Sequence, residues 1–176
     1  VRTTRQLPQR KSALSPWEQA ERGRETLEAI PPDTRTRADY DHALNAYRAI
    51  YHADPADLHA PASVFAVAQL LAEDGRTRHD PKRLQAAIGQ YEFLRTQYPA
   101  SSLRTKALLE QAQIEQNDLR DTQSAKDRYR LLLKLSPKSD EAAEARAALD
   151  TMTHPQSAKT TRPAATPPHE PALPPQ

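Results

Sequence analysis

The sequence predicts an all-α protein, a solenoid of about seven helices arranged as stacked helical hairpins. The first observation behind this is a pattern that occurs three times with identical spacing: Ala43, Tyr47, Ile50 and Pro55; Ala87, Tyr91, Leu94 and Pro99; Ala125, Tyr129, Leu132 and Pro137. A helical pattern that recurs every roughly 20–50 residues is typical of a solenoid, in which each unit buries its apolar face against its neighbours. The second observation is the composition. The chain has only three glycines and 5% aromatic residues, and it lacks an alternating run of β-branched residues, which favours helices over strands.

Each copy of the pattern predicts one helix that ends before a proline. The alanine, the tyrosine and the aliphatic residue lie on one helical face, since positions i, i+4 and i+7 line up at 3.6 residues per turn. The alanine lets a neighbouring helix approach, and the two larger side chains fill the space beyond it. Proline ends the helix because it lacks an N–H and disfavours the helical conformation in the residue before it. Three unrelated amphipathic helices are the alternative, but the matching proline offset favours a repeat.

A partner helix is predicted upstream of the second and third copies. Residues 63–76 align without a gap with residues 107–120, and both segments begin eight residues after a repeat proline. Asp74-Gly75 predicts a helix stop, with Gly75 in the left-handed conformation. The copies begin at residues 43, 87 and 125, so they are 44 and 38 residues apart. A longer connection from Gly75 to Pro81 than from Leu119 to Thr122 is expected to explain this difference.

Two further helices complete the predicted domain. A first helix is expected from Trp17 to Ala29, with Ser15 as its N-cap and Pro16 in its first turn. A last helix is expected from Ser139 to about Met152, and it resembles the unpaired terminal helix that closes many solenoids. The repeat domain is therefore predicted to span residues 15–153.

The two ends differ in composition from the repeat domain. Residues 1–14 contain four basic and no acidic residues and show no helical periodicity, so we expect a disordered basic arm. Residues 154–176 contain seven of the 16 prolines and are expected to form an extended linker or tail. A linker implies a following domain, and the chain starts with valine, so we favour a fragment or a processed product over a protein with a free tail.

The spacing of alanine, aromatic residue and proline resembles the second half of a tetratricopeptide repeat, with tyrosine where phenylalanine is commoner. The tryptophan and Leu-Gly signature of the first half is absent. Residues 90–99, followed by Ser101-Ser102, are similar to tetratricopeptide modules of bacterial cell-envelope proteins. Residues 39–51 and 66–76 are similar to the repeat regions that precede the catalytic domain of some N-acetylmuramoyl-L-alanine amidases. The resemblance covers about residues 15–152.

The resemblance implies a non-catalytic module for protein–protein or cell-wall interaction. Such a module would be located in the periplasm or cell envelope. The zinc hydrolase domain of the amidase would be absent from this chain. The alternative is a free-standing periplasmic adaptor in envelope biogenesis or cell division. Zinc is expected only in the missing catalytic domain, and no catalytic residue of that domain has a matching position here.

The sequence offers no set of residues for catalysis or metal binding. A zinc hydrolase needs three converging protein ligands and an open position for water. The histidines have no such spacing: His42, His52, His59, His79, His154 and His169. There is no cysteine and no phosphate-binding glycine loop. We therefore predict no catalytic residue, metal or cofactor in this chain, although a self-sufficient helical enzyme is a third, less favoured class.

The expected binding site is a groove lined by the first helix of each hairpin, where partners of this repeat class commonly lie. With Ala68 and Ala112 as the inward small residues, the predicted groove residues are Phe65, Gln69, Glu73, Lys106, Leu109, Gln113 and Asn117. This mixture suits an extended peptide or a peptidoglycan-associated ligand. The alternatives are a merely solvated face and a face covered by the proline-rich tail. No nucleic-acid partner and no transmembrane segment are expected, because a basic surface with aromatic residues and an apolar run of about 18 residues are both absent.

Overall fold

The computed structural model describes residues 13–154, and within that range it contains helices and no strand. The helices are α1 (Pro16–Glu28), α2 (Arg37–Ala53), α3 (Ala60–Arg78), α4 (Pro81–Gln97), α5 (Leu103–Gln113), the π-helical turn η1 (Ile114–Asp118), α6 (Thr122–Leu135) and α7 (Asp140–Thr153). The predicted all-α class and the seven α-helices are confirmed for this range. The basic arm and the proline-rich tail lie almost entirely outside the described residues, so their predicted disorder remains a prediction.

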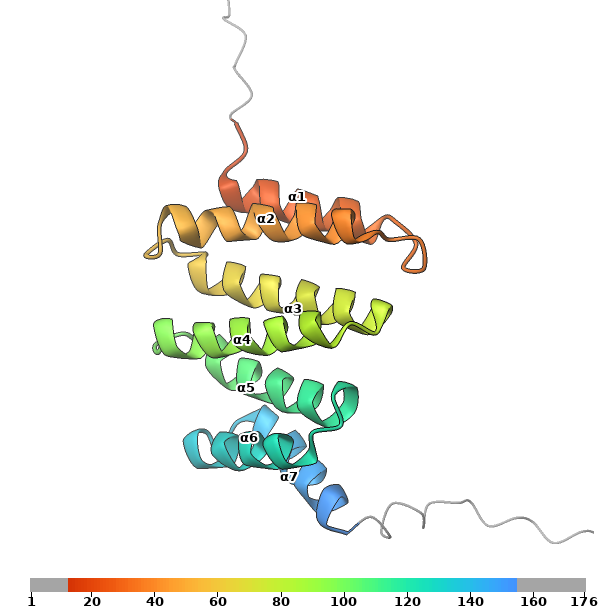
Figure 1. Cartoon of the computed structure of the whole chain (residues 1–176). Helices are drawn as coiled ribbons and strands as arrows, with labels where there is room; N and C mark the ends of the chain where they lie inside the picture. Colours follow the sequence, from red (N-terminus) through yellow and green to blue (C-terminus); the bar gives the residue numbers. More distant parts are fainter. Residues whose placement is uncertain (1–12, 155–176) are drawn as a thin grey trace, which may run out of the picture.

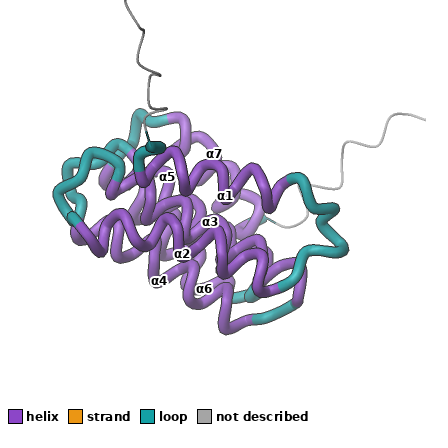
Figure 2. Tube along the Cα trace, turned by 90° about the horizontal axis from the view of Figure 1, so that it is seen from above, coloured by secondary structure: helices purple, strands orange, loops and turns teal. Residues whose placement is uncertain are grey.

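The helices run back and forth and are stacked in chain order from α1 to α7 (Figure 1). Each helix packs against the next one along the chain, and α5 also contacts α3 and α7. Viewed along the stack, α1, α3, α5 and α7 form one layer, and α2, α4 and α6 form the other (Figure 2). Alternate helices are therefore neighbours in space, which places residues from distant parts of the sequence on a common surface.

Side-chain caps fix where most of these helices begin. Ser15 accepts a hydrogen bond from the N–H of Glu18, whose carboxylate accepts one from the N–H of Ser15, so α1 starts with a complete capping box. Thr36 and Asp39 make the same reciprocal pair at the start of α2. Asp80, Asp121 and Ser139 cap α4, α6 and α7. The predicted first and last helices agree with α1 and α7 to within one residue at each end.

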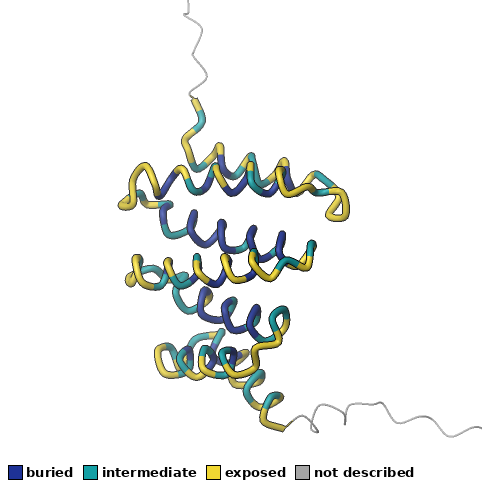
Figure 3. Tube along the Cα trace, in the orientation of Figure 1, coloured by how far each residue is buried: buried dark blue, intermediate teal, exposed yellow. Residues whose placement is uncertain are grey.

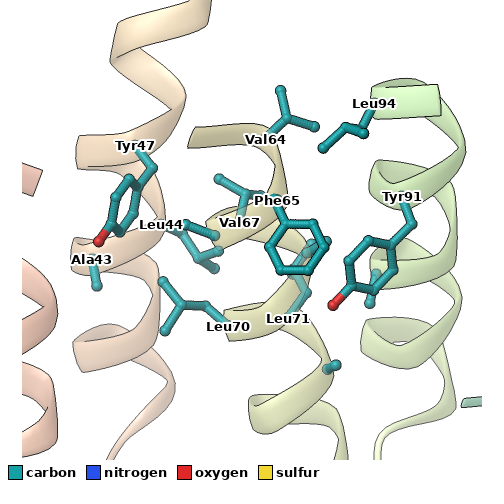
Figure 4. Packing of buried hydrophobic residues seen from close by; sticks show 14 of the residues in the cluster. Ala43, Leu44, Tyr47, Val64, Phe65, Val67, Leu70, Leu71, Tyr91 and Leu94 are labelled. Carbon is teal, nitrogen blue, oxygen red and sulfur yellow. The ribbon is translucent and has the colours of Figure 1, made fainter. Parts of the chain in front are cut away.

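The nine alanine, tyrosine and aliphatic residues of the repeated pattern all lie in the core, and none is more than 4% exposed. Those of α2 face α1, where Tyr47 contacts Trp17, and those of α4 face α3, where Tyr91 contacts Phe65 (Figure 4). One apolar cluster spans α1 to α4 and continues to Ala107 of α5 and Ile114 of η1, and a second spans α5 to α7. Helix α3 is buried along most of its length, whereas α4 has one exposed side (Figure 3).

The predicted helix stop at Asp74-Gly75 is wrong. Helix α3 continues to Arg78, and the residue that takes the left-handed conformation is His79, with φ 52°. Gly75 is instead a contact point, because a Cβ there would lie 2.9 Å from Cγ and 3.0 Å from the backbone nitrogen of Leu84. The glycine is needed for the close approach of α4, and tertiary packing overrides its weak helix propensity.

The unequal spacing of the repeats also has a different cause from the predicted long loop. Only His79 and Asp80 separate α3 from α4, so most of the extra residues are helical. Helix α4 begins at Pro81, six residues before the repeat alanine Ala87, whereas α6 begins at Thr122, three residues before Ala125. The longer unit therefore has a longer hairpin, extended at the end of α3 and at the start of α4.

A buried carboxylate holds this extended hairpin to α2. Asp74 is 0% exposed, and its two oxygens lie 2.6 Å from Nε of Arg78 and 3.0 Å from Nε of Arg83. Arg83 in turn reaches Asp41 of α2 at 2.8 Å. A buried charge is tolerated only when it is paired in this way, so the cluster fixes the register of three helices.

Candidate partner-binding face

Side chains of neighbouring odd-numbered helices contact one another at three places along the stack. The contacts are a hydrogen bond of 3.4 Å from Arg24 Nη1 to Gln69 Oε1, a cation–π contact with Lys106 Nζ 5.6 Å from the ring centroid of Phe65, and a hydrogen bond of 3.3 Å from Gln113 Nε2 to Glu144 Oε2. The first joins α1 to α3, the second α3 to α5, and the third α5 to α7. We call the surface that carries these six residues the odd-helix face.

Five of the seven predicted groove residues belong to this face or lie directly beneath it. Gln69 and Gln113 are half-buried, and Lys106 is exposed. Phe65 and Leu109 are each only 6% exposed. The ring of Phe65 packs edge-on against Tyr91, with the ring centroids 5.3 Å apart. The two apolar residues therefore support the face and leave little of their own surface for a partner.

The other two predicted groove residues have different surroundings. Glu73 pairs with Arg35 and accepts a hydrogen bond of 3.0 Å from the hydroxyl of Tyr40, so it also ties α3 to the start of α2. Asn117 lies in η1 and lines a shallow recess that includes His79. The prediction placed Asn117 by α-helical spacing from Gln113, but a π-turn has more residues per turn and changes the phase of the helix.

Charged residues that the sequence analysis did not select also contribute to the odd-helix face. Arg24 and Glu144 contact Gln69 and Gln113, as described above. Glu110 of α5 is half-buried, and burial raises the pKa of its carboxyl group, while the nearby positive charges of Arg76 and Lys106 act in the opposite direction. Glu110 follows Lys106 by four residues, so helical spacing alone could have placed it beside a predicted groove residue.

The repeat tyrosines are held in the core as neutral phenols. Tyr47 donates a hydrogen bond of 2.6 Å to Glu21, and Tyr129 donates one of 2.7 Å to Gln116. Within the described residues, the buried hydroxyl of Tyr91 has no hydrogen-bond partner. Burial raises the pKa of Tyr129 to about 12 and raises the pKa values of the other two tyrosines as well. These groups keep their protons at neutral pH, so their role is to pack and position helices.

The described part of the chain does not bring metal ligands together. In residues 13–154, no group of three or more His, Cys, Asp or Glu side chains is arranged to hold a metal ion. His59 is half-buried and stacks on Trp17, with ring centroids 4.8 Å apart. Four other histidines are exposed, two on α2 and one each at the ends of α3 and α7, and His169 lies outside the described residues.

Comparison with known proteins finds no protein family whose model matches this sequence and no curated protein that matches it. The tetratricopeptide and amidase resemblances therefore stay predictions from the sequence. Between residues 13 and 154, no helix combines the length and the apolar character needed to cross a bilayer.

Proposed function

We propose that this chain is a non-catalytic interaction module that binds its partner on the odd-helix face. The observation that carries the proposal is the set of three contacts through which four successive odd-numbered helices share one surface. A face that is continuous over four helices can hold a ligand much longer than a small molecule. Among residues 13–154, the histidines and the neutral core tyrosines form no group of converging acids and bases, which favours binding over catalysis.

An extended peptide or a wall-related polymer suits the chemistry of this face. The side-chain amides of Gln69 and Gln113 each provide donors and an acceptor, which can pair with the backbone amides of an extended ligand. Arg24 and Lys106 carry positive charge, whereas Glu110 and Glu144 carry carboxyl groups. The face therefore carries charges of both signs, which favours a ligand with both amides and charges over a uniformly charged polymer.

The proposal extends to the type of repeat and to the parent protein. The three-fold pattern and the two alternating layers support a tetratricopeptide-like solenoid, although its first-half signature is missing. The similarity of residues 39–51 and 66–76 supports the repeat region of a peptidoglycan amidase. In that case the module would position a separate zinc hydrolase domain on the wall, in the periplasm or cell envelope.

Co-sedimentation with purified bacterial peptidoglycan tests the binding proposal. The double substitution Gln69→Glu and Gln113→Glu adds two negative charges to the odd-helix face and should reduce co-sedimentation strongly. The matched control is Gln85→Glu with Gln123→Glu, which adds the same charge to exposed residues of α4 and α6 in the other layer. Unchanged far-UV circular dichroism would show that both variants remain helical. Equal binding by the two variants would contradict the assignment of the face.

A free-standing envelope adaptor is a second candidate, and a recess in the even-numbered layer favours it. This recess, of about 350 Å³, is lined mainly by aromatic side chains of α2 and of the end of α4, among them Tyr51, Phe93 and Tyr98. An adaptor must hold two partners at once, and two separate surfaces would allow that. The reading frame beyond Gln176 in the gene distinguishes the candidates, because a zinc hydrolase domain there supports the amidase and a stop codon supports the adaptor.

A further inference from the structure

A pocket separate from the odd-helix face lies where the loop between α4 and α5 meets the end of α6. Its volume is about 190 Å³, and it is lined by two arginines, four hydroxyl side chains and three leucines. None of its described lining residues is acidic. Pockets for drug-sized ligands are usually about 300–1,000 Å³, so this one suits a small anion or the terminal group of a longer ligand.

The pocket has more positive than negative charge around it. The side chain of Arg95 is 10% exposed, and Nη1 lies 2.6 Å from Oε2 of Glu92. The same carboxylate oxygen also pairs with Arg128 at 3.1 Å, and Arg128 reaches Glu115 at 3.3 Å. Arg104 has no carboxylate partner within the described residues. Three guanidinium groups therefore face two carboxylates, which leaves one positive charge to be balanced.

The positive charges also affect one another. Burial lowers the pKa of Arg95, the charge of Glu92 acts in the opposite direction, and the charges of Arg128 and Arg104 lower the pKa further. A bound anion would reduce this repulsion. The carbonyl end of α6 lies at the same pocket and disfavours negative charge, so the guanidinium groups must supply the attraction.

Hydroxyl groups line the polar side of the pocket. The hydroxyls of Thr105 and Ser136 lie 3.1 Å apart, so one donates to the other and the second hydrogen remains for another acceptor. Ser102 precedes the first residue of α5, and its side chain makes no capping hydrogen bond. Ser102 and one hydroxyl of the Thr105–Ser136 pair can therefore donate to the oxygens of a small anion held by Arg104.

The rest of the lining is apolar, and part of it is exposed. Leu135, at the end of α6, is 52% exposed, whereas Leu108 and Leu132 are buried. A single excess positive charge matches a monovalent anion better than a divalent phosphate. We propose that this pocket binds the carboxylate of a ligand with a short aliphatic group, with the carboxylate at Arg104 and the hydroxyls and the aliphatic group against Leu135.

Titration with small probes, followed by the side-chain Nε–Hε NMR resonances of Arg95 and Arg104, tests this proposal. The probes are acetate, 4-methylpentanoate, acetyl-leucine, acetyl-leucine amide and inorganic phosphate. Saturable shifts are expected with the carboxylates, with tighter binding of the two that have an aliphatic group. Arg104→Gln should weaken that binding about tenfold or more, since a charge-assisted hydrogen bond is lost. Arg130→Gln, on the exposed side of α6, is the matched control and should bind as the unaltered protein does.

The outcomes separate the sources of the carboxylate and the ways in which the proposal could fail. Tighter binding of acetyl-leucine than of 4-methylpentanoate assigns the pocket to the end of a peptide chain, and the reverse order assigns it to a free aliphatic acid. Equal shifts with acetyl-leucine and its amide, a response to phosphate alone, or no saturable shift would each overturn the proposal. Leu135→Ala provides a second test on an exposed side chain, because it should weaken 4-methylpentanoate and leave acetate unchanged. None of these results depends on the odd-helix face.

Discussion

Replacing Gly75 with alanine tests the packing of α3 against α4. Gly75 is buried and helical, so alanine can adopt its backbone conformation without strain. The added Cβ would lie 2.9 Å from Cγ, 3.0 Å from Cδ2 and 3.0 Å from the backbone nitrogen of Leu84. The side chain of Leu84 could move, but its backbone nitrogen belongs to the first turn of α4 and could move only with the helix.

Two opposing effects set the size of the expected change. Alanine is more favourable than glycine inside a helix by about 0.5–1 kcal/mol. Overpacking a well-filled core costs about 1–3 kcal/mol. Because the contact includes backbone, the cost should exceed the gain, and the free energy of unfolding should fall by about 1–2 kcal/mol.

Urea denaturation followed by far-UV circular dichroism measures this change, and the chain provides its own control. A Cβ at Gly89, on the exposed side of α4, would have no atom within 4 Å, so Gly89→Ala should stabilise the protein by about 0.5–1 kcal/mol. The double variant Gly75→Ala with Leu84→Ala should show a coupling energy of at least about 0.5 kcal/mol, since the two residues share the contact. A stabilising Gly75→Ala, or additive effects of the two substitutions, would refute the close approach of α3 and α4.

Three further predictions follow from buried polar groups. Asp74→Asn should lower the free energy of unfolding by about 3–5 kcal/mol, measured by urea denaturation, because it leaves two arginines without their buried partner; a loss below about 1 kcal/mol would contradict the network. Tyr91→Phe should be neutral or stabilising, since its hydroxyl has no partner among the described residues, whereas Tyr47→Phe should cost about 1 kcal/mol through the lost bond to Glu21. Similar losses for both would contradict this difference. Glu110→Gln should stabilise the protein at neutral pH, and urea midpoints between pH 4 and 7 test the pH dependence of that gain.

The sign of the Glu110 effect follows from its raised pKa. The unfolded chain has a glutamate pKa of about 4.3, so between that value and the higher folded pKa the folded state binds more protons. Its stability therefore decreases as the pH rises through this window, and the loss is complete above the folded pKa. The advantage of Glu110→Gln should be absent near pH 4 and should grow toward neutral pH. A constant difference between the two proteins would contradict the burial of this carboxyl group.

The sequence allowed most of the helical architecture to be predicted, because the evidence for it is local. The repeated alanine, tyrosine and proline positions reveal the faces and ends of three helices, and the caps Ser15 and Ser139 mark the first and last helices. The end of α3 could not be predicted in this way. A glycine can end a helix or can allow a neighbouring helix to approach closely, and the sequence around Gly75 does not distinguish these two roles. The close contact of Gly75 with Leu84 of the next helix decides between the two roles, and that contact is tertiary.

The candidate site was predicted in part for the same reason. Helical spacing placed Gln69 and Gln113 on the face with Lys106 at its edge, but their contacts with Arg24 and Glu144 depend on how alternate helices stack. Asn117 was placed by α-helical spacing that the π-turn η1 interrupts. The carboxylate pocket draws its residues from the α4–α5 loop and the end of α6, and no local pattern connects those segments.

The most direct test of the account is an NMR titration with soluble peptidoglycan fragments that follows glutamine side-chain amides. The account predicts that the amides of Gln69 and Gln113 shift on binding, while those of Gln85 and Gln123 in the other layer stay unchanged. Shifts confined to Gln85 and Gln123, or no shift at any fragment concentration, would contradict the assignment of the odd-helix face as the partner-binding surface.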